Sequence, residues 1–181
     1  MSEVAYFGGG CFWCLQPAMD AVPGVVQTSV GFMGGSSEDA VYEKVYTGTT
    51  DHVEIVSVEF DAELTAFRDL LWVFWKNIQP TQAGGQFADK GSHYRSVVFA
   101  SNAEQFKEAQ ASLDALKSAN IFDKPVVTTV EQAQSFYPAS EDHQQYHLKN
   151  PEKFQKELGD SGREEFLACG GNPIRREDLG W

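Results

Sequence analysis

The segment 53–60 has the clearest hydrophobic pattern in the chain, with apolar residues at every second position, which predicts a β-strand. One face of that strand carries Glu54, Val56, Val58 and Phe60. Because all but the first of these are apolar, we expect this face to point into the core and to bury the Glu54 carboxyl group. Burial disfavours a charged carboxylate, so the pattern predicts a raised pKa for Glu54.

Similar patterns along the rest of the chain predict alternating strands and helices. Strands rich in β-branched or apolar residues are expected at 4–7, 25–32, 94–99 and 126–130, and helices at 64–78 and 103–119, with shorter ones near 13–21 and 39–45. This alternation predicts an α/β (α+β) fold, a two-layer sandwich in which helices cover a mixed β-sheet. The pattern weakens towards the C-terminus, so we expect one domain over residues 1–181, with 150–181 as an irregular C-terminal tail.

The segment Gly8-Gly9-Gly10-Cys11-Phe12-Trp13-Cys14 joins the first predicted strand to the first predicted helix. Glycine allows a turn with positive φ, and Pro17 fits only near the start of a helix. We therefore expect regular helix to begin near Trp13 or Cys14, with Cys11 at or just before its N-terminus. A helix N-terminus stabilises negative charge, so we expect a lowered pKa for a cysteine at this turn and take the turn as the candidate active site.

Composition narrows the possible partners and the compartment. The 181 residues carry a net charge of −12, which argues against nucleic acid or an anionic membrane as a partner. No apolar run is long enough to span a bilayer, and the N-terminus lacks the features of a signal peptide. Three cysteines do not form a disulfide scaffold, so we expect a reducing cytoplasm, where a Cys-x-x-Cys pair indicates redox or metal chemistry.

Each candidate residue also has an ordinary structural interpretation. Cys11 and Cys14 can be buried small hydrophobes, and a zinc site would need two more ligands, from Cys169 and a histidine, at a spacing that matches no common pattern. Phe12 and Trp13 can be core residues rather than the wall of a pocket. The other candidates, individually weak, are Tyr42, Tyr146 and the polar residues Asp89, His93 and Tyr94 of the long glycine-rich loop 80–92 and its end.

Taken together, these motifs resemble a known family. In chain order they are Gly-Cys-Phe-Trp at 10–13, Gly-Phe-Met-Gly-Gly at 31–35, Val-Tyr at 41–42, His-Val-Glu at 52–54, Pro-Thr-Gln at 80–82, Asp-Lys-Gly-Ser-His-Tyr-Arg-Ser at 89–96, Phe-Tyr at 136–137 and His-Gln-Gln-Tyr at 143–146. This series closely resembles the peptide methionine sulfoxide reductase A family, over about the first 150 residues. The resemblance implies a two-layer α/β sandwich with a mixed sheet, as the hydrophobic pattern predicts.

The resemblance also implies a reaction and a set of site residues. Cys11 matches the family's nucleophile, which takes oxygen from methionine-S-sulfoxide, free or in proteins, and becomes a sulfenic acid. A second thiol then forms a disulfide, which thioredoxin reduces, and neither a metal nor an organic cofactor is expected. The remaining matches are the proton-donating Glu54, the phenols Tyr42 and Tyr94, the methyl-binding Phe12 and Trp13, the polar pocket residue Asp89 and the aromatic wall residue Tyr146.

The chain departs from the family pattern at Cys14, Gln16, Phe32 and Asp51, where members commonly have glycine, glutamate, tyrosine and glycine. We expect little loss from Gln16, because the acid role falls to Glu54. Cys14 is our first candidate for the resolving thiol, since it lies only three positions from Cys11 in the chain. Cys169, the one tail cysteine, is the second candidate or a later shuttle.

Two other functions are compatible with parts of the chain. A thioredoxin-like disulfide oxidoreductase would use Cys11 and Cys14 but would not need Glu54 and the two phenols. A binding module for oxidised methionine would not need a reactive thiol at Cys11.

Overall fold

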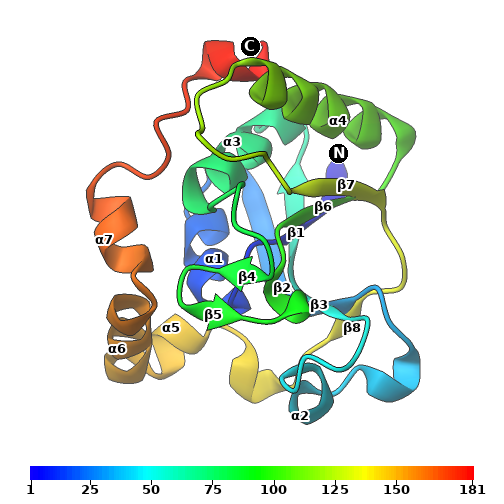
Figure 1. Ribbon diagram of the computed structural model, residues 1–181. Helices are drawn as coiled ribbons and strands as arrows, with labels where there is room; N and C mark the ends of the chain where they lie inside the picture. Colours follow the sequence, from blue (N-terminus) through cyan, green and yellow to red (C-terminus); the bar gives the residue numbers. More distant parts are fainter.

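A six-stranded mixed β-sheet forms the centre of the computed structural model, which describes residues 1–181 (Figure 1). Its strands are β1 (Ser2–Gly8), β2 (Val25–Met33), β3 (Val53–Asp61), β6 (Val97–Ala100), β7 (Thr129–Gln132) and β8 (Tyr137–Pro138). The spatial order is β7-β6-β1-β3-β2-β8, and every neighbouring pair is antiparallel except β6 and β7. The predicted mixed sheet is therefore confirmed. A separate hairpin joins β4 (Gly85–Gln86) to β5 (Asp89–Lys90).

Three helices pack on one face of this sheet: α1 (Phe12–Asp20), α3 (Phe67–Asn77) and α4 (Ala103–Ser118). Their apolar residues and those of the facing strands form a single cluster of 24 buried residues. Shorter helices are α2 (Tyr42–Val45) and α5 (Tyr146–Lys149), with 3-10 turns at Ser37–Asp39, Ser92–Tyr94, Glu141–His143 and Arg176–Leu179. The two-layer arrangement of helices on a sheet agrees with the prediction.

The alternation in β3 is realised as the pattern predicts. Val56, Val58 and Phe60 belong to the main core cluster, while Val53 and Ile55 belong to a second cluster of five residues on the opposite face of the sheet. Glu54 lies on the same side as the main cluster and is buried. The strand thus carries a carboxyl group into the layer between the sheet and α1.

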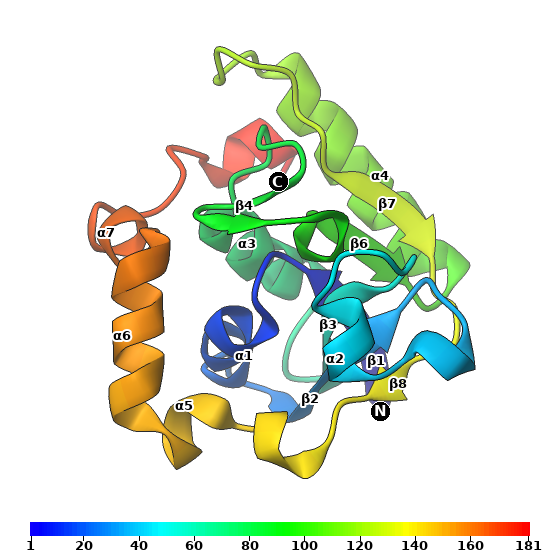
Figure 2. The same cartoon turned by 60° about the horizontal axis from the view of Figure 1, so that its bottom comes forward.

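The C-terminal segment is helical, so the predicted irregular tail is wrong. Residues 150–181 contain α6 (Pro151–Ser161) and α7 (Arg163–Ala168), which follow α5 along one side of α1 (Figure 2). Pro151 occupies the first turn of α6, and Gly162 ends it in a left-handed conformation, both common at helix boundaries. The hydrophobic pattern did not predict α6, because the helix has only a thin apolar stripe. Ser161 is its one buried residue.

Two predicted strands begin later than expected. Tyr94 lies in the 3-10 turn Ser92–Tyr94, and the strand after it starts at Val97. The last long strand is Thr129–Gln132, not 126–130.

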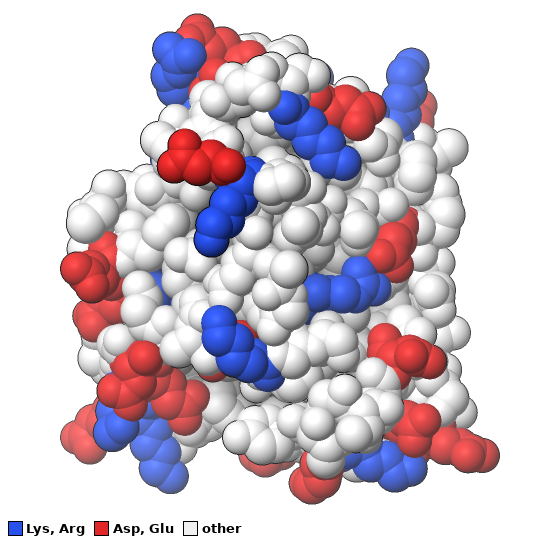
Figure 3. All heavy atoms as spheres, in the orientation of Figure 1, with Lys and Arg blue, Asp and Glu red and all other residues white.

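No helix has the length and apolar character needed to cross a membrane. Figure 3 shows acidic and basic side chains interspersed over one face of the molecule.

Candidate active site

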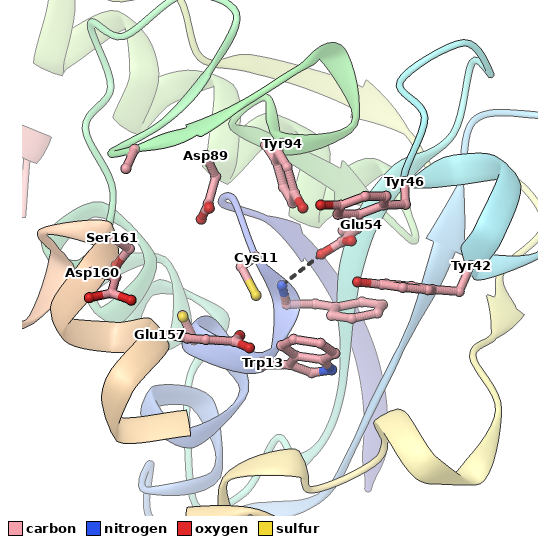
Figure 4. A pocket seen from close by; sticks show the side chains of 13 residues that line it. Cys11, Trp13, Tyr42, Tyr46, Glu54, Asp89, Tyr94, Glu157, Asp160 and Ser161 are labelled. Carbon is pink, nitrogen blue, oxygen red and sulfur yellow. Dashed lines mark hydrogen bonds between the residues drawn. The ribbon is translucent and has the colours of Figure 1, made fainter. Parts of the chain in front are cut away.

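A pocket of about 410 Å³ opens beside the N-terminus of α1. Figure 4 shows side chains from α1, α2, β3, the β4–β5 hairpin and α6 pointing into it. Eight of its thirteen lining residues are candidates from the sequence: Cys11, Phe12, Trp13, Cys14, Tyr42, Glu54, Asp89 and Tyr94. The fold therefore gathers residues that are up to about eighty positions apart in the chain.

The glycine turn places Cys11 at the edge of this pocket. Gly10 has a φ of +85°, and a Cβ atom there would lie 2.7 Å from Cβ of Gln86, so both the backbone and the space require glycine. Cys11 is the N-cap residue of α1, and its carbonyl oxygen accepts hydrogen bonds from the backbone N–H groups of Cys14 and Leu15. The predicted place of Cys11, just before the helix, is confirmed.

The pKa values of the two thiols are shifted in opposite directions. The neighbouring Cys14 thiol, followed by burial and the nearby carboxyl groups, raises the pKa of Cys11. The Cys11 thiol in turn lowers the pKa of Cys14, and the guanidinium group of Arg163 acts in the same direction. The expectation of a lowered pKa is therefore wrong for Cys11, because the Cys14 thiol, burial and, more weakly, Glu54 and Asp89 oppose its ionisation, and the expectation holds for Cys14.

Glu54 faces the start of α1 from β3. Its side chain is buried, and its Oε2 atom accepts a hydrogen bond from the backbone N–H of Phe12 at 3.0 Å (Figure 4). Burial raises the pKa of Glu54 to about 8, and the hydrogen bond from Phe12 only partly opposes this effect. The carboxyl group therefore holds its proton at neutral pH, as the alternation in the strand predicts.

Two phenols approach the same carboxyl group from separate elements. Tyr42 begins α2, and Tyr94 ends the 3-10 turn before β6. In Figure 4 both hydroxyl groups point toward the part of the pocket that holds Glu54. Burial, followed by the charge of Glu54, raises the pKa of each phenol, so both remain hydrogen-bond donors.

Aromatic rings form one wall of the pocket. Trp13 stacks on Tyr146 with ring centroids 3.9 Å apart and an interplanar angle of 10°. Phe12 is almost fully buried and packs against Tyr42. Tyr146 does not line the pocket, so it supports Trp13 from behind. The imidazole ring of His143, which the sequence did not single out, lies 4.3 Å from the ring of Tyr42.

The remaining pocket residues were missed from the sequence. They are Tyr46, Ala88 and three residues of α6, Glu157, Asp160 and Ser161 (Figure 4). The backbone N–H of Ala88 donates to the carbonyl oxygen of Ser161 at 3.1 Å, which attaches α6 to the β4–β5 hairpin. Because the α6 segment was expected to be irregular, no sequence signal placed it at the pocket.

Other candidates lie outside the pocket. Cys169 is exposed at the C-terminal end of α7 and does not line it. Gln16 is buried, where its amide oxygen accepts from the backbone N–H of Gln145 at 3.0 Å and its amide nitrogen donates to the hydroxyl group of Thr28. Gln16 is thus a structural residue of the layer beneath the pocket.

The site combines a thiol pair, a protonated carboxyl group and two phenols, which are the groups that a thiol-dependent reductase of an oxygen-bearing substrate needs. The model of the family described as peptide methionine sulfoxide reductase matches residues 3–169. The chain therefore belongs to the peptide methionine sulfoxide reductase family, and the resemblance seen in its motifs is confirmed.

Similar proteins support this assignment over most of the chain. Peptide methionine sulfoxide reductase MsrA of Halalkalibacterium halodurans is 43% identical over 165 residues, which cover 91% of this chain and 94% of that protein. Reduced Mxr1 from Saccharomyces cerevisiae has a similar structure, with a TM-score of 0.78, 27% identity and coverage of 83% of this chain and 87% of that chain. Methionine sulfoxide reductase A of Corynebacterium diphtheriae gives a TM-score of 0.73 and 32% identity, covering 83% and 76%.

Proposed function

We propose that this protein reduces methionine-S-sulfoxide, free or in proteins, to methionine by means of a cysteine sulfenic acid and an intramolecular disulfide. Membership of the family supports the reaction. The observation that carries the mechanism is the shared pocket of Cys11 and Glu54, in which the carboxyl group has a pKa of about 8. A neutral carboxylic acid beside a thiol can protonate an oxygen atom while the thiol attacks the neighbouring sulfur.

In the first step, the Cys11 sulfur attacks the sulfur atom of the sulfoxide. Glu54 gives its proton to the sulfoxide oxygen, and the proton that leaves Cys11 replaces it. The oxygen moves to Cys11, which becomes a sulfenic acid, and methionine leaves with its sulfur reduced by two electrons. Tyr42 and Tyr94 donate hydrogen bonds to the oxygen while negative charge develops on it.

The other lining residues hold the substrate in place. Phe12 and Trp13 are proposed to contact its methyl group, and Tyr146 keeps the indole ring of Trp13 in position through the stacked contact. Asp89, on β5, is proposed as a polar contact on the opposite side of the pocket. Burial raises the pKa of Asp89, while Arg163 and Lys90 oppose that effect.

Cys14 is proposed as the resolving thiol. It lines the same pocket as Cys11, and its backbone N–H donates to the Cys11 carbonyl oxygen at 3.1 Å, so both thiols belong to the first turn of α1. Cys169, by contrast, is exposed and lies between two attachment points of the tail, since Arg163 and Asn172 on either side of it are both buried. We assign Cys169 at most a later role in passing the disulfide on.

A thioredoxin is proposed as the reductant of the disulfide. Mxr1 from Saccharomyces cerevisiae has been solved in complex with Trx2, which supports such a partner for a protein of this fold.

We further propose that residues 1–181 work as one domain and that the protein acts in the cytoplasm. The three free cysteines suit a reducing compartment.

A single-turnover assay tests the reaction. Reduced protein is mixed with each epimer of a methionine sulfoxide peptide, without any reductant, and methionine is measured. We expect about one methionine per protein from the S epimer and none from the R epimer. If the S epimer gives no methionine while the Cys11–Cys14 pair still exchanges with a peptide disulfide, the protein is a disulfide oxidoreductase and the proposal fails.

A further inference from the structure

Arg163 is a buried cation without a carboxylate partner. Its side chain begins α7 and is 1% exposed, the lowest value for any charged residue in the chain. None of the ion pairs of the structure includes it. Burial of an unpaired charge is costly, so some other group must balance this guanidinium.

The contacts of Arg163 direct it at the turn that carries the thiols. Its Nη2 atom donates to the carbonyl oxygen of Gly9 at 2.5 Å, although the two residues are 154 positions apart. Nη2 also lies 2.8 Å from the place where a Cβ atom of Gly10 would be. The ring of Phe87 covers the guanidinium at 4.6 Å, while Nη1 is buried and has no hydrogen-bond partner. These contacts leave the charge free to act on neighbouring anions.

The anionic groups that face Arg163 belong to the pocket: Cys14, Cys11 and Asp89. Of these three groups, Cys14 is the one whose ionisation depends most on the guanidinium. Asp89 is a carboxylic acid and ionises without a cation nearby, and Cys11 also faces Glu54, which opposes its ionisation. The charged and titratable groups that face Cys14 are Cys11, Arg163, Asp89, Glu157 and Glu54, and Arg163 is the only cation among them. After the Cys11 thiol, which has the largest effect, Arg163 lowers the pKa of Cys14, while burial, Asp89 and Glu157 raise it.

We propose that Arg163 is a positioning residue that keeps the Cys14 sulfur negatively charged, ready to attack the sulfenic acid on Cys11. The proposal rests on the reaction proposed above, which supplies that sulfenic acid. The Cys14 thiolate attacks the Cys11 sulfur, an S–S bond forms, and the S–O bond breaks. Hydroxide leaves and takes up a proton to become water. The Cys14 sulfur is oxidised and the Cys11 sulfur is reduced.

This role also explains why the C-terminal helices are attached to the glycine turn. Arg163 contacts the glycine turn from α7, and Cys169 is the only sequence candidate in that part of the chain. The tail would then supply the positive charge for the second half of the reaction, while its own cysteine remains exposed outside the pocket.

Titration of Cys14 alone tests the charge effect without any substrate. In protein with Cys11→Ser and Cys169→Ser, the ultraviolet absorbance of the thiolate gives the pKa of Cys14. Arg163→Gln, which removes the charge but keeps a donor for Gly9, should raise this pKa by about one to three pH units. Arg163→Lys should raise it less, and the exposed control Arg175→Gln should leave it unchanged. Equal shifts with Gln and Lys, or no shift with Gln, would overturn the proposal.

A second measurement keeps the test valid if Arg163→Gln does not fold. With Arg163 intact in the same background, its guanidinium NMR resonances should move with the same midpoint as the Cys14 titration. Resonances that stay constant while Cys14 ionises would also overturn the proposal.

The kinetic consequence separates this proposal from the proposed function. In Cys169→Ser protein, single turnovers with the S epimer give methionine first and the disulfide second. Arg163→Gln should slow disulfide closure about tenfold or more at pH 7, and the defect should disappear at high pH, where Cys14 ionises unaided. A closure rate that falls equally at all pH values would overturn the proposal. A failure to form methionine in unsubstituted protein would instead refute the proposed function and leave the titration result standing.

Discussion

Replacing Glu54 by glutamine should stabilise the protein, and by more as the pH rises. The carboxyl group is 2% exposed, and burial raises its pKa from 4.5 to about 8. Glutamine has nearly the same shape and keeps an oxygen atom for the hydrogen bond from Phe12. The substitution therefore removes the ionisable group with little change in packing.

The sign and size of the effect follow from linkage. A carboxyl group with a raised pKa binds its proton more tightly in the folded state, so its contribution is complete below about pH 4.5 and is lost as the pH rises to about 8. An increase of about 3.5 in pKa corresponds to about 5 kcal/mol, at about 1.4 kcal/mol per unit. This is a large part of the typical net stability of about 5–15 kcal/mol, so a buried Glu54 is kept at a considerable cost.

The assay is denaturant unfolding from about pH 5 to about pH 9. All three cysteines are replaced by serine in every protein, so that thiol titration does not contribute. The matched control is Glu59→Gln, which removes a carboxyl group from the partly exposed face of the same strand. The free energy of unfolding of Glu54→Gln relative to the parent should increase from about pH 5 and level off above about pH 8. A difference that stays constant over this range would refute the assignment of a buried, protonated Glu54.

Three further predictions follow from the site. Glu54→Gln should slow methionine formation in a single turnover by about 10²–10⁴-fold, because it cannot give a proton to the oxygen; an unchanged rate would remove Glu54 as the acid. Cys14→Ser should accumulate sulfenic acid at Cys11, detected with a dimedone probe, whereas Cys169→Ser should still close the disulfide; the opposite pattern would make Cys169 the resolving thiol. Gly10→Ala should lower the free energy of unfolding by about 1–3 kcal/mol, because φ is +85° and the new Cβ would meet Gln86; equal stability would contradict the described turn.

The parts of the site that lie on regular elements could be predicted from the sequence. Alternation along the strand is a local property, so it identified Glu54 as a buried acid before any contact was known. The glycines before Cys11 likewise indicated a turn into a helix. Both signals depend on neighbouring residues alone.

The other parts depend on contacts between distant segments. The helix α6 has almost no buried residues of its own, so the pattern did not predict it, and with it Glu157 and Asp160 were missed. The bond between Arg163 and Gly9 joins opposite ends of the chain, which no local pattern can indicate. Contacts between distant segments also affect the two thiols. Groups from β3, β5 and α7 contribute to the pKa shifts of Cys11 and Cys14, in addition to the effect of the helix terminus.

The central claim is that Cys11 takes the oxygen atom of methionine-S-sulfoxide. Its most direct test is the mass of each cysteine-containing peptide after one turnover in protein with Cys14→Ser and Cys169→Ser, in which no disulfide can form. We predict one added oxygen on Cys11 for each methionine released from the S epimer, and none with the R epimer. Methionine released without oxygen on Cys11, or no methionine at all, would contradict the account.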